Sequence, residues 1–395
     1  MGQVGQGNKS RFIKLAALML TSAFGLTGCS GFFTAIGTGT GSGGTGTSSW
    51  VYVPNFGGTL AEYSLASGVL TPLSGSPITL PLAPYSIVLA PNNVFLYIGT
   101  GTGVFLYTIN TDGTLTEGNG ANVAYVNPTN SSLIAQSMVI DPTSSWLLIA
   151  YRNSNVLDAV QLDPTTGLPT GAVFSINSSA STASPQLAIS SANKQVFVTL
   201  GTAGTEALGF NPSGTTAPLG PWPSSGIPIG VAAAKASANS VTVDPTSKYL
   251  YITEANTNAA GDALAGTVRI LSTADLTKDL DDEPTGIGPS AVLSDLTGAF
   301  VYVTNGSDGT ISGFTLDATA QKLTSLGDAF PTEKSPVAII EDRSKTSLMT
   351  VGSLANPNLW IYSFDASSAG SLDVGSTRST AATNPSASTG IAVTH

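Results

Sequence analysis

Two charged residues follow apolar segments at positions where their side chains could do chemistry. Arg152 comes directly after Trp146–Tyr151, and Glu254 follows Tyr249–Thr253. A guanidinium is a planar fork of N–H donors that binds carboxylates and phosphates, and a carboxylate in a cleft can act as a general base. Together they could orient an ester-like carbonyl and activate water against it. The alternative is that Arg152 is merely solvated and that no such pair forms.

Further polar residues follow other apolar segments in the same way. The predicted ligand-binding residues of this kind are Asn55, Asn153, Asn256, Asn305 and Asp308. Convergent polar side chains of this type suit a hydroxyl-rich ligand. Asn and Asp also tolerate the backbone angles of tight turns, so turn geometry alone explains the same pattern.

Other catalytic chemistries have little support in the sequence. The only histidine, His395, is the last residue, so a Ser-His-Asp triad or a histidine-based metal site would depend on the chain end. The acidic segment Asp275–Glu283 lacks the glycine turn of a calcium loop, and we expect a solvated outer loop there. Gly99–Gly103 leads into no helix and is not a dinucleotide loop. We therefore expect neither a metal nor a cofactor.

The elements that must position these residues form a repeat. Phe300–Leu316 has the pattern of a hairpin, with a β-branched and aromatic strand, a turn at Asn305–Gly309 and an alternating second strand. Each repeat adds a short apolar strand before the hairpin and a variable fourth strand after it, such as Val123–Val126. The hairpin strands recur every 45 to 54 residues, at Tyr52, Tyr97, Leu148, Phe197, Tyr251, Tyr302 and Met349. Four strands in a period of this length predict a β-propeller.

The two ends of the repeat predict how the ring closes. The hairpin at Trp50 has no apolar strand before it, whereas Gly390–Thr394 matches such a strand and no hairpin follows it. Hydrophobic residues make up 42% of the chain and charged residues 10%, which fits many short strands. We predict an all-β, seven-bladed propeller over residues 50–395, with one-plus-three closure by the C-terminal strand.

A family resemblance rests on the hairpin residues. Tyr302-Val303-Thr304-Asn305 is the YVTN tetrapeptide, and residues 52–55 and 251–254 are near copies. The chain resembles YVTN-repeat and seven-bladed lactonase-like propellers, whose best-known enzymes hydrolyse 6-phosphogluconolactone. The resemblance implies the fold more strongly than the activity, because these are strand and turn residues. It carries over no catalytic residue, and only Arg152 of the four arginines after residue 49 falls at the predicted channel mouth.

The N-terminus predicts export and lipidation. In residues 1–28, three basic residues precede the apolar segment Leu15–Leu26, which is too short to span a bilayer. Leu26-Thr27-Gly28-Cys29 resembles the bacterial lipobox, which implies lipid attachment at Cys29. The alternative is a conventional cleavage site beside an incidental thiol.

The residues after the signal set the expected location and partners. Residues 29–49 contain the lipidated Cys29 and a flexible Gly/Ser/Thr tether. Ser30 stands where Asp would resemble an inner-membrane retention signal, which favours the outer membrane. Removal of the signal leaves a net charge near −13, so nucleic acid is not an expected partner. The expected partner is the membrane, to which the lipid on Cys29 attaches the chain.

Two functions compete on these grounds. The first is an envelope-anchored propeller that binds a glycan, a small metabolite or an envelope protein at the channel mouth without catalysis. The second is a lactone hydrolase that uses Arg152 and Glu254. The scarcity of catalytic residue types favours the first.

Overall fold

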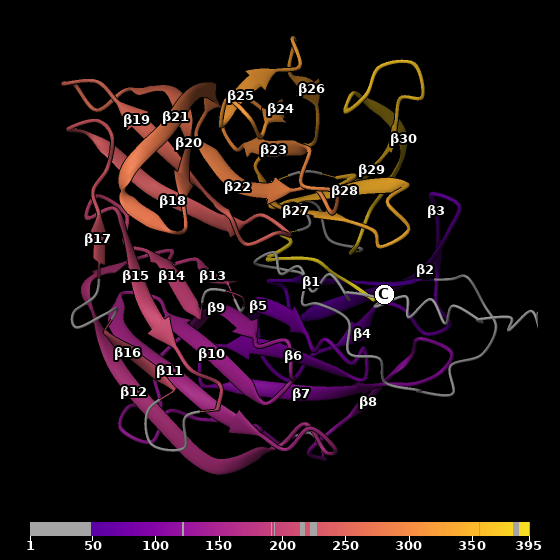
Figure 1. The fold of residues 1–395 in the computed structure, drawn as a ribbon. Helices are drawn as coiled ribbons and strands as arrows, with labels where there is room; N and C mark the ends of the chain where they lie inside the picture. Colours follow the sequence, from indigo (N-terminus) through magenta and orange to yellow (C-terminus); the bar gives the residue numbers. More distant parts are fainter. Residues whose placement is uncertain are drawn as a thin grey trace, which may run out of the picture.

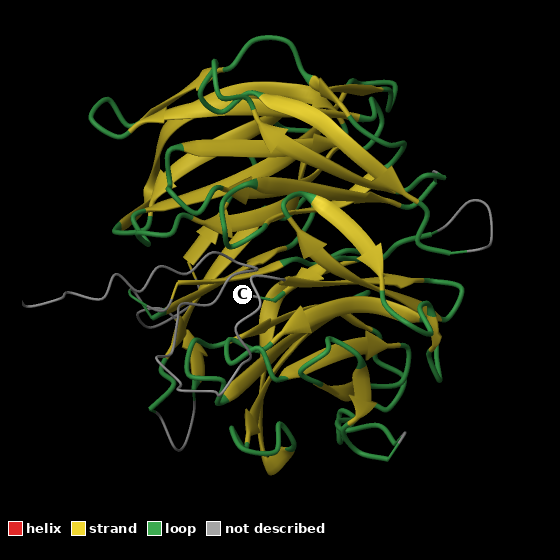
Figure 2. Cartoon of the chain, turned by 90° about the vertical axis from the view of Figure 1, so that its right-hand side faces the viewer, coloured by secondary structure: helices red, strands yellow, loops and turns green. Residues whose placement is uncertain are grey.

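The described residues form one ring of β-sheets. The computed structural model describes residues 49–120, 122–190, 192, 194–213, 218–221, 227–354, 356–381 and 387–394. The expected signal peptide, Cys29, the tether up to residue 48 and His395 lie outside these ranges. Within them the structure contains strands and loops and no helix (Figure 2), so no helix of this part could cross a bilayer. Seven antiparallel sheets surround a central channel (Figure 1), which confirms the predicted seven-bladed propeller.

Each blade runs outwards from an innermost strand at the channel. The first contains β31 (Ala392–Val393), β1 (Ser49–Asn55), β2 (Thr59–Ala66), β3 (Val69–Pro72) and β4 (Ile78–Thr79). The second contains β5 (Pro84–Leu89), β6 (Phe95–Thr100), β7 (Val104–Ile109) and β8 (Leu115–Glu117). The third contains β9 (Ala135–Ile140), β10 (Trp146–Tyr151), β11 (Ser154–Leu162) and β12 (Pro169–Thr182). The fourth contains β13 (Leu187–Ser190), β14 (Gln195–Thr199), β15 (Thr205–Phe210), β16 (Leu219–Pro221) and β17 (Ile227–Ile229).

The remaining three blades follow the same order. The fifth contains β18 (Ala236–Val243), β19 (Tyr249–Thr257), β20 (Ala263–Ser272) and β21 (Asp275–Ile287). The sixth contains β22 (Pro289–Ser294), β23 (Phe300–Asn305), β24 (Thr310–Asp317), β25 (Lys322–Ser325) and β26 (Phe330–Pro331). The seventh contains β27 (Pro336–Glu341), β28 (Ser347–Gly352), β29 (Leu359–Phe364) and β30 (Leu372–Arg378).

Three expectations about strands have different outcomes. The C-terminal strand does complete the first blade: β31 pairs with β1, and the chain end lies beside that strand in Figure 1. Val123–Val126 was expected to be the fourth strand of the second blade, but β8 holds that place. Tyr125 makes only a single bridge to Val104, because its ring turns inwards to reach Asp158. Asp275–Glu283 is likewise part of strand β21 and not a loop.

A buried polar cluster fastens the closed ring. Asn55 at the end of β1 donates to the Thr380 carbonyl (3.1 Å) and accepts from the Thr380 hydroxyl (2.7 Å). Asn358 donates to the hydroxyls of Thr380 and Ser388. We call these four residues the closure clasp. It joins the first blade, the last blade and the C-terminal segment, and all four side chains are at least 98% buried.

A tyrosine and a glycine form the joint between several neighbouring blades. The hydroxyls of Tyr52, Tyr97 and Tyr302 donate to the carbonyls of Gly113, Gly167 and Gly370, at 2.6 to 2.8 Å. Each glycine lies in the turn between the third and fourth strands of the next blade. The aromatic residue two positions before each tyrosine, Trp50, Phe95 or Phe300, packs against the same glycine. The first two aromatic positions of the hairpin strand therefore hold the next blade in place.

Substitution of Gly370 tests this joint. Gly370 has φ +82°, and a Cβ there would lie 2.4 Å from the Phe300 ring. Gly75 has φ +87° and no neighbour within 4 Å of a Cβ, so it is a matched control for the backbone cost. We expect Gly370→Ala to lower the free energy of unfolding by about 1–3 kcal/mol more than Gly75→Ala, because it also overpacks the joint. Equal losses in chemical denaturation would contradict the role of the joint.

Candidate functional site

The ring opens into one mouth, where the turns between second and third strands meet the starts of the innermost strands. A cavity of about 480 Å³ lies there and is lined by residues of all seven blades. Beneath this cavity, the channel between the innermost strands is narrower and encloses only about 60 Å³. The cavity is large enough for a small metabolite, and the narrow channel is not.

Sequence reasoning missed most of the polar residues of the mouth. Tyr85, Gln136, Gln186, Asn239 and Ser290 each take the first channel-facing position of a blade and line the cavity. A signal for them exists in the sequence, because each follows a Pro or Ala at or near the start of an innermost strand. That position lies at the mouth end of the innermost strand. Its side chain faces the channel, whereas the apolar residues that follow pack between blades.

Arg152 is the predicted site residue that does line the cavity. Its backbone N–H donates to the Ile134 carbonyl (3.0 Å). This bond ties the end of β10 to the start of β9 in the third blade. The side chain is exposed, and its guanidinium makes no hydrogen bond or ion pair with any residue that the structure describes. No Asp, Glu or His is among the described residues of the cavity wall, so Arg152 gives the mouth a positive charge that this wall does not neutralise.

Two polar atoms in the wall have no protein partner. Gln136 Oε1 and Thr389 Oγ1 are buried, and neither makes a hydrogen bond within the described part of the chain. Both residues line the mouth cavity and the narrow part of the channel below it. A buried polar atom without a partner costs about 1–3 kcal/mol. Both atoms are closed to solvent, so a ligand hydroxyl could bind them once their side chains turn towards the cavity.

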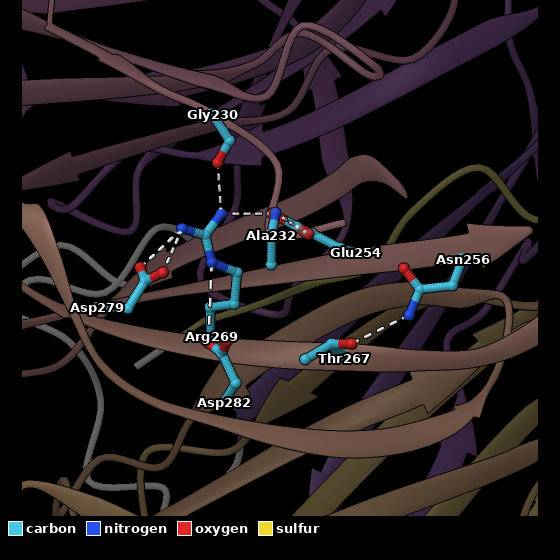
Figure 3. Close-up of polar contacts among 8 residues, drawn as sticks. All are labelled: Gly230, Ala232, Glu254, Asn256, Thr267, Arg269, Asp279 and Asp282. Atoms are coloured by element: carbon cyan, nitrogen blue, oxygen red, sulfur yellow. Dashed lines mark hydrogen bonds and ion pairs between the residues drawn. The ribbon is translucent and has the colours of Figure 1, made fainter. Parts of the chain in front are cut away.

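Glu254 does not lie at the mouth, contrary to the expectation. Its side chain is 1% exposed, and Oε1 accepts from Arg269 Nη1 at 2.6 Å (Figure 3). Oε2 accepts from the Ala232 N–H at 2.9 Å. Arg269 also binds Asp279 (2.7 Å) and the Gly230 carbonyl (2.6 Å). The pairing of Arg152 with Glu254 was wrong, because the extended β19 turns Glu254 towards the neighbouring β20 and the loop before β18.

The electrostatics of this cluster fit a structural role. Burial alone would lower the pKa of the Arg269 guanidinium, but the hydrogen bonds and charges of Glu254 and Asp279 outweigh burial and raise it. Each Glu254 oxygen accepts a hydrogen bond and the side chain is 1% exposed, so the carboxylate is not accessible to a substrate. We infer that the Glu254 carboxylate holds β19 to β20 within the fifth blade.

The predicted amides serve mostly the architecture. Asn55 belongs to the closure clasp, and Asn305 donates to Thr310 and Ser312 (3.0 Å each) across its own turn. Asn256 donates to the Ala265 carbonyl (3.0 Å) within the β19–β20 hairpin. Turn geometry, the alternative for these residues, is the better explanation.

Two further predicted binding residues are exposed. Asn153 has φ 54°, and its N–H donates to the Thr182 carbonyl at the end of β12 (2.8 Å). Asp308 accepts from the Ile287 N–H at 2.6 Å. Neither is among the residues that line the mouth cavity. Their expected role in binding remains a prediction.

Other carboxylates with shifted pKa values are not among the residues that line the cavity. Burial raises the pKa of Glu333 to about 7, and the hydroxyls of Thr332 and Thr350 hold its carboxylate beneath Gly352. Burial raises the pKa of Glu341 to about 8, beside the turn at Asp342. In the described ranges no group of three or more His, Cys, Asp or Glu side chains is arranged to hold a metal ion. The mouth therefore offers binding groups and no evident general base.

Comparisons with known proteins agree on the architecture. No protein-family model matches the chain, and a search of curated proteins found no significant match. Among solved structures, it is similar to the periplasmic gluconolactonase of Pseudomonas aeruginosa, with a TM-score of 0.70 and 12% identity over 88% of this chain and 99% of that one. It is also similar to a Bacteroides fragilis protein provisionally described as a 6-phosphogluconolactonase, with a TM-score of 0.67 and 14% identity over 89% of this chain and 99% of that one.

A third similar structure has no known function. It is a Desulfotomaculum acetoxidans protein, with a TM-score of 0.60 and 13% identity over 88% of this chain and 99% of that one. At these identities the likeness supports the fold alone, a seven-bladed propeller. The chemistry must be argued from the site.

Removing Glu254 tests its structural role. We expect Glu254→Ala to lower the free energy of unfolding by about 3–5 kcal/mol, because it leaves the buried Arg269 without its closest partner. The double variant Glu254→Met, Arg269→Met should lose less than this single variant, and the exposed Arg152→Ala should change stability by at most about 0.5 kcal/mol. Denaturant titration measures all three. Full stability of Glu254→Ala would restore the possibility that this carboxylate is free for catalysis.

Proposed function

We propose that the protein binds a hydroxyl-rich, negatively charged small molecule, such as a sugar acid, at the channel mouth and does not turn it over. One observation carries this proposal: an unpaired guanidinium shares a cavity of about 480 Å³ with neutral amides and hydroxyls and with no described carboxylate or histidine. Arg152 suits a carboxylate in a bidentate pair. The unpartnered atoms of Gln136 and Thr389 suit hydroxyl groups.

The second candidate function is lactone hydrolysis. It is favoured by the similar propellers, because the Pseudomonas aeruginosa protein is a gluconolactonase and the Bacteroides fragilis protein is provisionally described as a 6-phosphogluconolactonase. Arg152 could polarise a lactone carbonyl, but activation of water near neutral pH needs a positioned base. The described wall of the cavity supplies none, so binding is the better account of this site.

We further propose that the mouth faces away from a membrane to which lipid on Cys29 anchors the chain. Strand β1 begins at Ser49 and runs towards the mouth, where Asn55 and Phe56 lie. The start of β1 at Ser49 therefore lies at the face opposite the mouth. A lipid anchor there would leave the mouth open to solutes.

The charge of Arg152 is the first test of binding. In titration calorimetry, gluconate should bind the wild type, and Arg152→Ala should weaken it about 10-fold or more, because a hydrogen-bonded ion pair is lost. Arg343→Ala, in the turn at the opposite end of its blade, is the matched control and should leave the affinity unchanged. Binding that ignores the loss of Arg152 would contradict the proposal.

The same preparations decide between the two candidate functions. Glucono-1,5-lactone and its 6-phosphate should open no faster with the protein than in buffer. Turnover above that background, lost in Arg152→Ala but retained in Arg343→Ala, would make the second candidate correct.

Lipid attachment is tested in a bacterium that expresses the full chain. Labelled palmitate should enter the protein and appear in the membrane fraction, and Cys29→Ser should abolish both. Ser30→Ala, one residue on, should keep the label. Label that persists in Cys29→Ser would contradict the anchor.

A further inference from the structure

An aromatic residue is exposed at the rim of the mouth. Phe56 follows β1 and is 47% exposed, and it lines the cavity together with Arg152 and Gln136. Its backbone is fixed: the Phe56 N–H donates to the Ala387 carbonyl (2.8 Å), and the Gly58 N–H closes the turn onto Asn55 (2.9 Å). The closure clasp lies directly beneath this turn. The ring is therefore displayed at the mouth from a rigid base.

A second aromatic ring holds Phe56 in position. The rings of Phe56 and Tyr85 meet edge to face, with centroids 5.3 Å apart and planes at 84°. Tyr85 in turn lies against the turn of the second blade, where a Cβ on Gly101 would be 3.9 Å from its ring. Edge-to-face pairs of this kind stabilise the orientation of both rings. The Tyr85 hydroxyl makes no hydrogen bond with the residues described, so it is free to bind a ligand.

The aromatic pair and the cation come from neighbouring blades of the mouth. The aromatic pair comes from the first and second blades, whereas Arg152, Gln136 and Gln186 come from the third and fourth. A pyranose ring has matching chemistry, since its axial C–H groups form an apolar face and its edge carries hydroxyls. An open-chain sugar acid has the hydroxyls and the carboxylate but no rigid apolar face.

We propose that Phe56, held by Tyr85, is a stacking platform for the pyranose ring of a sugar acid whose carboxylate reaches Arg152. This inference rests on the proposed binding function and narrows its ligand to the cyclic form. Phe56 and Tyr85 are then specificity-determining residues, because they distinguish closed rings from open chains. A platform that is ordered before binding loses little conformational entropy when the ligand arrives.

The test compares two carboxylates by titration calorimetry: methyl β-glucuronide, a locked ring, and gluconate, an open chain. The wild type should bind the glucuronide at least about 10-fold more tightly. Phe56→Leu, which keeps an apolar side chain but removes the flat ring, should weaken the glucuronide about 5-fold or more and change gluconate less than 2-fold. Phe56→Trp should retain the preference. Leu82→Ala, at an exposed apolar residue outside the cavity wall, should have no effect.

The outcomes separate the two proposals. Equal affinities for both carboxylates, or an equal response of both to Phe56→Leu, would overturn the stacking platform and leave Arg152-dependent binding intact. Binding of neither carboxylate would overturn both proposals. Thermal melts of each variant check the fold, which an exposed side chain such as Phe56 is not expected to control.

Discussion

Closure of the ring is the constraint on which the rest of the structure depends. Each blade buries its faces against two neighbours, so an open ring would expose two apolar sheets. Strand β31 prevents this by pairing with β1, and the closure clasp of Asn55, Asn358, Thr380 and Ser388 satisfies the polar groups at that junction. Between other blades, tyrosine hydroxyls donate to glycine carbonyls of the next blade. There too a buried hydrogen bond, at the end of a packed aromatic ring, holds one sheet against the next.

This architecture decides which polar groups remain free for a ligand. Serine and asparagine side chains near the axis also link the innermost strands, as Ser86 does to Ala135 and Asn239 to Pro289. Most amides and carboxylates are thus committed to holding the blades. The groups left over at the mouth are few, and they define its chemistry: a cation, unpartnered polar atoms and an aromatic pair.

The sequence predicted the fold well and the site in part. The period of the hairpin, the missing first strand at Trp50 and its counterpart at Gly390–Thr394 were enough for the seven blades and their closure, because these patterns are local. Arg152 was placed at the mouth by its position after β10. Glu254 holds the equivalent position after the buried start of β19, but a longer strand and a partner 15 residues away, Arg269, turn it into the blade. Contacts of that kind, like the meeting of Phe56 with Tyr85, depend on how blades face one another and leave no local pattern.

A crystal structure of the propeller soaked with methyl β-glucuronide is the most direct test of the account. The account predicts the sugar in the mouth cavity, with its carboxylate on the Arg152 guanidinium, its ring over Phe56 and its hydroxyls near Gln136 Oε1 and Thr389 Oγ1. A sugar bound elsewhere on the propeller, or a mouth that stays free of it at concentrations that saturate binding in solution, would contradict the central claim.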